Sequence, residues 1–289
     1  MKTAAILGVM VALLTAPVLA ETPLIIVAAE NFYGDIASQI AGPEARVTSI
    51  LSNPDQDPHL FEASPAAGRA LSSARLVIYN GVDYDPWMAK LLRAAKSVNR
   101  RVVVVGEVVH RKPGDNPHLW YDLPNVAAAA RAIAAALTDI DPAAAPATQQ
   151  RLDVFLDSLK PIQTRIAAIR TRFTGAQVTA TEPVFGLMAT ALGLQMRNER
   201  FQLAVMNGTE PRASDVAAFE ADLRQHRVRV LLYNSQASDS AAKRLLDIAR
   251  QAGIPVVGVT ETEPAGQTYQ TWMMAQLDAL DAALEKAAP

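Results

Sequence analysis

The stretch RLDVFLDSLKPIQTRIAAIRTRF, residues 151–173, has the periodicity of a long amphipathic helix. Its apolar side chains recur every three or four residues, at Leu152, Phe155, Leu156, Leu159, Ile162, Ile166 and Ile169. Pro161 removes one backbone N–H from this pattern, so we expect the helix to bend or split there. The helical pattern covers about 147–173, near the middle of the chain. It predicts a stiff connector between two parts rather than a flexible linker rich in glycine and serine.

Short apolar runs alternate with longer amphipathic segments on both sides of this connector. We expect strands over 24–29, 46–51, 75–80 and 101–106 before it, and over 176–181, 227–234 and 255–260 after it. We expect helices over 33–42, 64–74 and 85–97, from Pro183, over 239–253 and from about Tyr269. Continuous runs of valine, isoleucine and leucine between helices are typical of parallel sheets covered on both faces. The sequence thus predicts an α/β fold with two parallel-sheet lobes, over 21–145 and 175–289, joined by a single long helix over 146–174.

Residues 1–20, MKTAAILGVMVALLTAPVLA, differ from the rest of the chain. A lysine at position 2 precedes a continuous apolar run that ends in small residues before Glu21, which is the layout of a cleavable secretory signal peptide. The apolar run of about 15 residues is shorter than the roughly 20 that a transmembrane helix needs. The chain contains no cysteine, so we expect no disulfide, no thiolate metal ligand and no lipid at the cleavage site. We therefore expect a soluble, non-lipidated protein of the periplasm.

The composition narrows the possible classes of function. Hydrophobic residues make up 50% and charged residues 19%, which is ordinary for a globular protein. The formal net charge of −2 gives no reason to expect a nucleic acid or an anionic membrane surface as a partner. Aromatic residues amount to only 6%, which argues against an aromatic-lined pocket for an organic ligand.

Residues able to bind a metal ion follow the ends of four expected strands. In open parallel sheets, ligands bind beyond the carboxyl ends of the strands. The candidates at these positions are, in chain order, His59, His118, Glu182, Glu261 and, two residues further on, Glu263. The histidines belong to the first lobe and the glutamates to the second, which would place a shared site in the cleft between the lobes. Two imidazoles and up to two carboxylates match the donors of a first-row transition-metal site.

The residues alone leave other interpretations open. A histidine in a loop often packs or caps, Glu182 could lie in the first turn of a helix, and Glu261 and Glu263 could be solvated. A zinc hydrolase could use both histidines and one glutamate, with the other glutamate as base. The chain has no GxSxG, HExxH, P-loop or dinucleotide-binding fingerprint. The remaining histidines, His110 and His226, lie among basic residues, and we expect them to be exposed.

Four segments resemble the metal-specific substrate-binding proteins of ABC importers, the periplasmic zinc- and manganese-binding family. They are DPHLFEASPAAGRALSSARLVIYNGVDYDPWMAKLL (57–92), NPHLWYD (116–122), TEPVFGLMATALGL (181–194) and PVVGVTETEPAGQTYQTWM (255–273). The resemblance covers essentially the whole mature chain, and it implies two α/β lobes joined by a rigid helix with one ion buried between them. It also implies that the metal ligands are His59, His118, Glu182 and Glu261, with Glu263 in reserve for the last.

The same resemblance implies a binding protein rather than an enzyme, whose cargo is Zn²⁺ or Mn²⁺ and whose partner is an inner-membrane ABC permease. We expect it to be a monomer. A surface adhesin on the same scaffold is a weaker alternative, because the chain lacks a cysteine for lipid attachment.

The sequence departs from zinc-type members of that family in two ways. They often carry a long loop rich in histidine and acidic residues before the second histidine ligand, whereas 107–116 is short and holds one histidine. Glu182 stands where many of them have a third histidine, and the added carboxylate suits the harder ion Mn²⁺. The same ligands will nevertheless hold Zn²⁺ more tightly than Mn²⁺ by the Irving–Williams order. The sequence therefore leaves both ions open as the cargo.

The stiff connector argues against a wide hinge closure. We expect loading and release to depend on small tilts of the lobes and on the loops at 107–117 or 203–212. Each ligating histidine needs an acceptor for its other ring nitrogen, and Asp57 and Asp122 are the nearby candidates. Acid should weaken binding, because the ligating histidines must be neutral to coordinate a metal ion.

Overall fold

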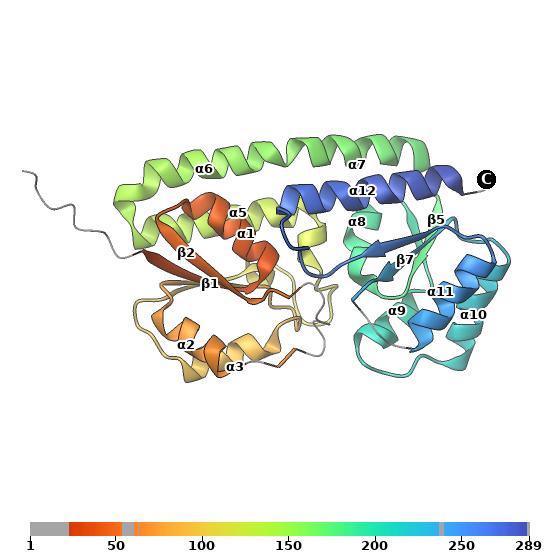
Figure 1. Cartoon of the computed structure of the whole chain (residues 1–289), viewed down its shortest axis with the longest axis horizontal. Coiled ribbons are helices and arrows are strands. Elements are labelled where there is room, and N and C mark those ends of the chain that lie inside the picture. Colours follow the sequence, from red (N-terminus) through yellow and green to blue (C-terminus); the bar gives the residue numbers. More distant parts are fainter. Residues whose placement is uncertain (1–22, 54–60, 63, 237–239, 288–289) are drawn as a thin grey trace, which may run out of the picture.

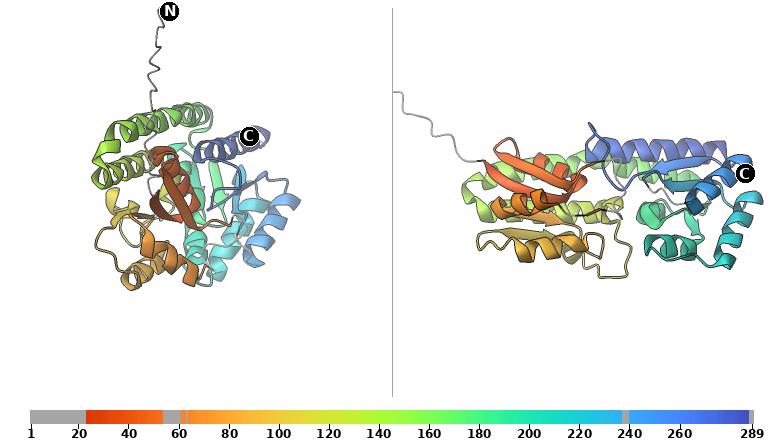
Figure 2. Two further views of the ribbon diagram at one scale, coloured as in Figure 1. Left: turned by 60° about the vertical axis from the view of Figure 1, so that its left-hand side comes forward. Right: turned by 60° about the horizontal axis from the view of Figure 1, so that its bottom comes forward.

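The structure is a computed structural model that describes residues 23–53, 61–62, 64–236 and 240–287. In these residues the chain forms two α/β lobes that lie side by side, and a pair of helices runs along one edge of both (Figure 1, Figure 2). None of the helices in this part of the chain combines the length and the apolar character that crossing a membrane requires.

The first lobe is built on a parallel sheet with the strand order β2-β1-β3-β4. Its strands are β1 (Leu24–Glu30), β2 (Ala45–Leu51), β3 (Leu76–Tyr79) and β4 (Arg101–Val104). Its helices are α1 (Asn31–Ala41), α2 (Pro65–Ser73), α3 (Pro86–Ala94), α4 (Val105–Val108) and α5 (Leu123–Ile140). β1 pairs with both β2 and β3, so the strand order reverses between β1 and β3. Ligands of such sheets bind at the carboxyl ends of the strands beside this reversal.

The second lobe repeats this arrangement with the strand order β6-β5-β7-β8. Its strands are β5 (Gln177–Ala180), β6 (Gln195–Arg197), β7 (Val230–Asn234) and β8 (Val256–Val259). Its helices are α8 (Gly186–Ala191), α9 (Glu199–Met206), α10 (Ala213–Arg224), α11 (Ser240–Gln251) and α12 (Tyr269–Lys286). All the strand pairs are parallel, so the order reverses between β5 and β7. The predicted fold class, two parallel-sheet α/β lobes, is confirmed.

Three elements of the second lobe were missing from the sequence prediction. β6 is a three-residue edge strand, Gln-Met-Arg, and contains no apolar run that would signal a strand. The helices α9 and α10 mix charged and apolar residues without a clear stripe, and the buried positions of α10 include two acidic residues, Glu220 and Asp222. The segment 203–212, which was expected to be a loop, contains the last turn of α9.

The connector consists of two helices, α6 (Ala145–Ser158) and α7 (Lys160–Phe173), where the prediction had a single long helix. They meet at Leu159, whose backbone is itself helical, so they run nearly end to end along the molecule (Figure 1). The expected break is explained by Pro161, which lies in the first turn of α7, where backbone N–H groups have no helical partner. α6 packs on α1 and α5 of the first lobe, and α7 packs on α12 of the second.

The start of α12 joins the two lobes a second time. Tyr269 N donates to Asp35 Oδ2 at 2.9 Å, and the Tyr269 hydroxyl donates to the backbone oxygen of Trp120 at 2.7 Å. Gln270 Nε2 donates to Gln39 Oε1 of helix α1 at 2.9 Å. The rest of α12 packs on β7, β8 and α7, so this helix fastens the first lobe to the second independently of the connector.

A buried apolar cluster runs through both lobes and beneath the boundary between them. Aromatic rings pack across the boundary: Tyr121 of the first lobe meets Phe185 edge to face with ring centroids 5.2 Å apart, and it meets Trp272 of α12 at 5.9 Å. Interfaces between domains that slide or hinge are usually more polar than this. The packing therefore supports lobes that keep nearly fixed positions.

Candidate metal centre

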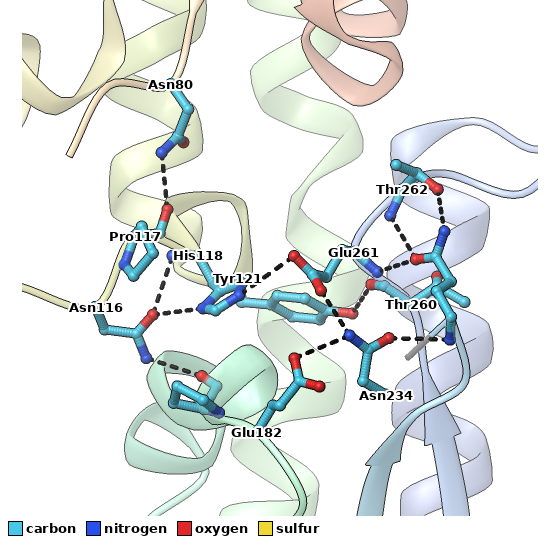
Figure 3. A network of polar contacts seen from close by, with 12 residues as sticks. Asn80, Asn116, Pro117, His118, Tyr121, Glu182, Asn234, Thr260, Glu261 and Thr262 are labelled. Atoms are coloured by element: carbon cyan, nitrogen blue, oxygen red, sulfur yellow. Dashed lines mark hydrogen bonds and ion pairs between the residues drawn. The ribbon is translucent and has the colours of Figure 1, made fainter. Parts of the chain in front are cut away.

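Three of the four predicted ligands lie together where the two lobes meet (Figure 3). His118 comes from the first lobe, immediately before the short 3-10 turn Leu119–Tyr121. Glu182 and Glu261 come from the second lobe, just beyond the carboxyl ends of β5 and β8. Their exposed fractions are 0%, 3% and 0% for His118, Glu182 and Glu261. Titratable groups are buried this deeply only when they are paired, hydrogen-bonded or used to bind a metal ion.

The imidazole of His118 faces the carboxylate of Glu261. His118 Nε2 lies 3.6 Å from Glu261 Oε2, which is too far for a hydrogen bond. Two such atoms bound to one tetrahedral zinc ion, each at roughly 2.0–2.2 Å, would lie about 3.4 Å from each other. The observed separation is therefore close to the one that a shared ion requires.

The hydrogen bonds of Asn116 determine which ring nitrogen of His118 is free of a proton and able to coordinate a metal ion. Asn116 Nδ2 donates to the Pro183 backbone oxygen at 2.8 Å, so its Oδ1 must be the acceptor toward His118 N and Nδ1, at 3.0 and 2.7 Å. Nδ1 therefore carries a proton, and Nε2 is the nitrogen that can coordinate a metal ion. The acceptor is thus Asn116 and not Asp122, which precedes α5; the other predicted candidate, Asp57, lies outside the described residues.

The two glutamates are bridged by an asparagine that the sequence analysis did not single out. Asn234 Nδ2 donates to Glu182 Oε2 at 3.1 Å and to Glu261 Oε1 at 2.6 Å. Asn234 is the last residue of β7 and stands at the reversal of strand order in the second sheet. The rule that found the glutamates could have found it, because it also follows from the carboxyl end of a strand. Its amide is uncharged and gives no metal-ligand signal in the sequence.

The loop that carries Glu261 is held from behind by Gln236. Gln236 Oε1 accepts hydrogen bonds from Glu261 N at 2.6 Å and from Thr262 N at 3.1 Å. Gln236 N in turn donates to Asn234 Oδ1 at 3.1 Å. These bonds link the backbone of Glu261 to the residue that bridges its carboxylate, so the position of this side chain is set by the fold.

The three predicted ligands do not surround a single point. In the described part of the chain, no group of three or more His, Asp or Glu side chains is placed closely enough to hold a metal ion. The Asn234 amide stands between the two carboxylates and keeps them on either side of its nitrogen (Figure 3). The fourth predicted ligand, His59, lies outside the described residues, and its role stays a prediction.

Glu263, the reserve candidate for the fourth ligand, is joined to the first lobe through its backbone. Its backbone N donates to Asn31 Oδ1 at 3.0 Å and its backbone oxygen accepts from Asn31 Nδ2 at 2.7 Å. Burial raises the pKa of Glu263 to about 8, and the negative charge of Asp35 adds to this shift. The structure thus places Glu261, rather than Glu263, beside the imidazole.

Aromatic rings cover the site on the side of the first lobe. The ring of Trp120 lies 5.3 Å from that of His118, and the ring of Tyr84 lies 6.0 Å from it, both edge to face. Burial raises the pKa of Tyr84 well above its usual value, and the negative charge of Glu261 adds to the shift. A site enclosed in this way has a low local dielectric, which strengthens the attraction between its carboxylates and a cation. His110 and His226 are exposed, as expected.

Comparison with known proteins agrees with this architecture. The chain matches the family ZnuA, zinc-uptake complex component A, periplasmic, over residues 26–283. It is 24% identical over 287 residues to the metal ABC transporter substrate-binding lipoprotein ScbA of Streptococcus cristatus, which covers 92% of this chain and 90% of that protein. It is 24% identical over 282 residues to the manganese ABC transporter substrate-binding lipoprotein PsaA of Streptococcus pneumoniae, covering 90% of this chain and 89% of that protein.

Among solved structures, the periplasmic zinc binding protein TroA of Treponema pallidum has a similar fold. The TM-score is 0.77 at 19% identity, and the match covers 91% of this chain and 99% of that one. The family match spans both sheets, the connector and nearly all of α12. This chain therefore belongs to the ZnuA family, the periplasmic component A of zinc-uptake complexes.

Proposed function

We propose that this chain captures one Zn²⁺ or Mn²⁺ ion between its lobes and delivers it to an inner-membrane ABC permease. The observation that carries the proposal is the approach of His118 Nε2 to Glu261 Oε2, at 3.6 Å, between two lobes and away from solvent. Family membership makes the chain a substrate-binding protein rather than an enzyme, so the hydrolase alternative is dropped.

Binding uses lone pairs that the fold already holds in place. His118 offers Nε2, because its Nδ1 proton is committed to Asn116. Glu182 and Glu261 supply two negative charges, which match a divalent cation and lower the cost of burying it. To reach a common ion, the two carboxylates exchange the shared Asn234 amide for the metal, a movement of side chains rather than of lobes. His59 completes the predicted set.

The predicted metal-ligating groups only partly determine which metal ion is the cargo. The related protein of S. pneumoniae is named for manganese, and the T. pallidum structure is named for zinc. A set of imidazoles and carboxylates binds Zn²⁺ more tightly than Mn²⁺ by the Irving–Williams order. We therefore propose that the purified chain prefers zinc, whichever ion the cell supplies to it.

The protein acts as a free monomer of the periplasm in this proposal. Residues 1–20 have the layout of a signal peptide, and they lie outside the described residues. The streptococcal relatives are named lipoproteins. This chain contains no cysteine, the residue that would carry such a lipid, so we propose that it is not lipidated.

The proposal is tested by metal analysis of protein purified from its native periplasm, together with growth of a deletion strain. We expect about one equivalent of zinc or manganese per chain, and slower growth of the deletion strain when that metal is scarce. A native protein that carries and binds neither ion, from a gene whose loss leaves growth on scarce metal unchanged, would exclude it.

A further inference from the structure

The side chain of Asn116 links the metal-binding face of the first lobe to the backbone of the second. Its Oδ1 accepts hydrogen bonds from the backbone and ring of His118, at 3.0 and 2.7 Å. Its Nδ2 donates across the lobe boundary to the Pro183 oxygen, at 2.8 Å, directly after Glu182 (Figure 3). One planar amide therefore contacts the imidazole of one predicted ligand and the peptide that follows another.

The Pro183 oxygen is also part of the helix that leads away from the site. It accepts a hydrogen bond from Gly186 N, which closes the 3-10 turn Pro183–Phe185 at the start of α8. Asn116, Pro183 and Gly186 are among the residues that line a cavity of about 400 Å³, whose other lining residues belong to the second lobe. The bond from Asn116 thus ends on the turn that fixes where α8 begins.

We propose that Asn116 is a positioning residue that couples the occupancy of the metal site to the 183–191 segment of the second lobe. The inference rests on the proposed role of His118 as a metal ligand. A cation on Nε2 withdraws electron density from the imidazole and makes Nδ1–H a stronger donor toward Asn116 Oδ1. That bond polarises the amide, and Nδ2–H becomes a stronger donor toward the Pro183 oxygen, as in any chain of linked hydrogen bonds.

The coupling works in both directions. If a bound ion tightens the contact between Asn116 and Pro183, then a tight contact must also hold the ion more strongly, by the same free energy. A membrane partner that separates the 183–191 segment from Asn116 would therefore weaken the hold on the metal. Unloading of the site then requires only a local opening at α8, which fits lobes that are fastened together by both the connector and α12.

The test is hydrogen exchange of the backbone amides in 184–191, measured with and without zinc. In the unmodified protein we expect zinc to slow this exchange about tenfold, a usual size for coupling between two sites. Asn116→Asp keeps an oxygen acceptor for His118 and loses the donor to Pro183. We expect this variant still to bind zinc, while zinc no longer slows exchange in 184–191.

Two further variants separate coupling from a general loss of contacts. Tyr269→Phe removes another buried hydrogen bond between the lobes, the one to the Trp120 backbone oxygen, and leaves the predicted ligands and Asn116 unchanged, so it should keep the full zinc effect. At Gly186 an added Cβ would lie 3.0 Å from Asn116 Nδ2, and alanine favours the helical backbone there. Gly186→Ala should therefore reduce the zinc effect on 184–191 without lowering thermal stability.

The inference is overturned if Asn116→Asp and Gly186→Ala keep the full zinc effect, or if Tyr269→Phe loses it as Asn116→Asp does. It is also overturned if the unmodified protein binds zinc tightly and shows no slowing in 184–191, a result that leaves the proposed function standing. An unmodified protein that binds neither zinc nor manganese would instead contradict the proposed function itself.

Discussion

His118 Nε2 and Glu261 Oε2 lie 3.6 Å apart across the boundary between the lobes, and neither side chain is exposed to solvent. The first is placed by the turn before α5 and the second by the loop after β8. Each is oriented by an uncharged neighbour, Asn116 for the imidazole and Asn234 for the carboxylate. The fold itself thus brings the two groups together.

Removing the imidazole should remove most of the metal affinity. His118→Ala leaves a buried ion without one ligand, so we expect a loss on the order of several kcal/mol in binding free energy. The matched control is His110→Asn, because His110 is exposed and has a left-handed backbone that asparagine tolerates. Competition titration of zinc against a chelator measures both. Equal affinities in the two variants would place the site elsewhere.

A negative charge at position 234 should lower the thermal stability of the protein without metal and increase the stabilisation that zinc gives. Asn234→Asp replaces the shared donor of Glu182 and Glu261 with a third carboxylate, and like charges held together are unfavourable. We expect the metal-free melting temperature to fall and the increase on adding zinc to exceed that of the unmodified protein. Asn99→Asp, at an exposed position, should change neither. An unchanged zinc response in Asn234→Asp would show that the bridge plays no part in binding.

A buried pair of carboxyl groups in the first lobe predicts a pH dependence of stability. Glu30, at the end of β1, is fully buried, and burial, followed by the nearby charge of Asp85, raises its pKa well above 4.5. Burial also raises the pKa of Asp85 to about 6. Between pH 4.5 and these raised values the folded chain holds protons that the unfolded chain has released. The free energy of unfolding of the metal-free protein should therefore fall as pH rises through this window.

Glu30→Gln tests the sign of this effect. The variant keeps the shape of the side chain and cannot ionise, so its stability should fall less between pH 4.5 and 8 than that of the unmodified protein. Urea unfolding with a chelator present, at several pH values, measures both slopes. Glu210→Gln controls for the loss of one acidic residue at an exposed position. Identical slopes in Glu30→Gln and the unmodified protein would refute the assignment.

Metal binding should leave the connector unchanged. The lobes are held by α6 and α7, by the start of α12 and by a continuous apolar cluster, so we expect loops rather than whole lobes to respond. Hydrogen exchange within 145–173 should be the same with and without metal, while 107–117, the segment before His118, should become protected. A large change in the connector would instead indicate that the lobes hinge.

The fold class could be predicted because strands such as β1, β3 and β7 contain continuous apolar runs and the connector has a clear helical period. The edge strand β6 and the helices α9 and α10 lack such patterns, and they are fixed by packing on the lobe rather than by local sequence. The contact of α12 with the first lobe could not be predicted from the sequence either. Its bonds to Asp35 and Gln39 join residues more than two hundred positions apart, which no local pattern records.

The sequence predicted the histidine and glutamate side chains of the candidate site, but it did not predict the two asparagines. Strand ends and the family resemblance pointed to His118, Glu182 and Glu261, and the structure brings these three together; their role as ligands stays a prediction. Asn116 and Asn234 carry no charge and belong to no metal-ligand pattern. Their importance arises only from geometry, because each presents a donor and an acceptor to groups from different segments.

Anomalous diffraction from crystals of the zinc-loaded protein would show where the ion binds. We expect one strong peak between the lobes, at roughly 2.0–2.2 Å from His118 Nε2 and from a carboxylate oxygen of Glu261, with Glu182 turned from Asn234 toward the same ion. An ion bound at another place, touching neither the imidazole of His118 nor the carboxylate of Glu261, would contradict this assignment.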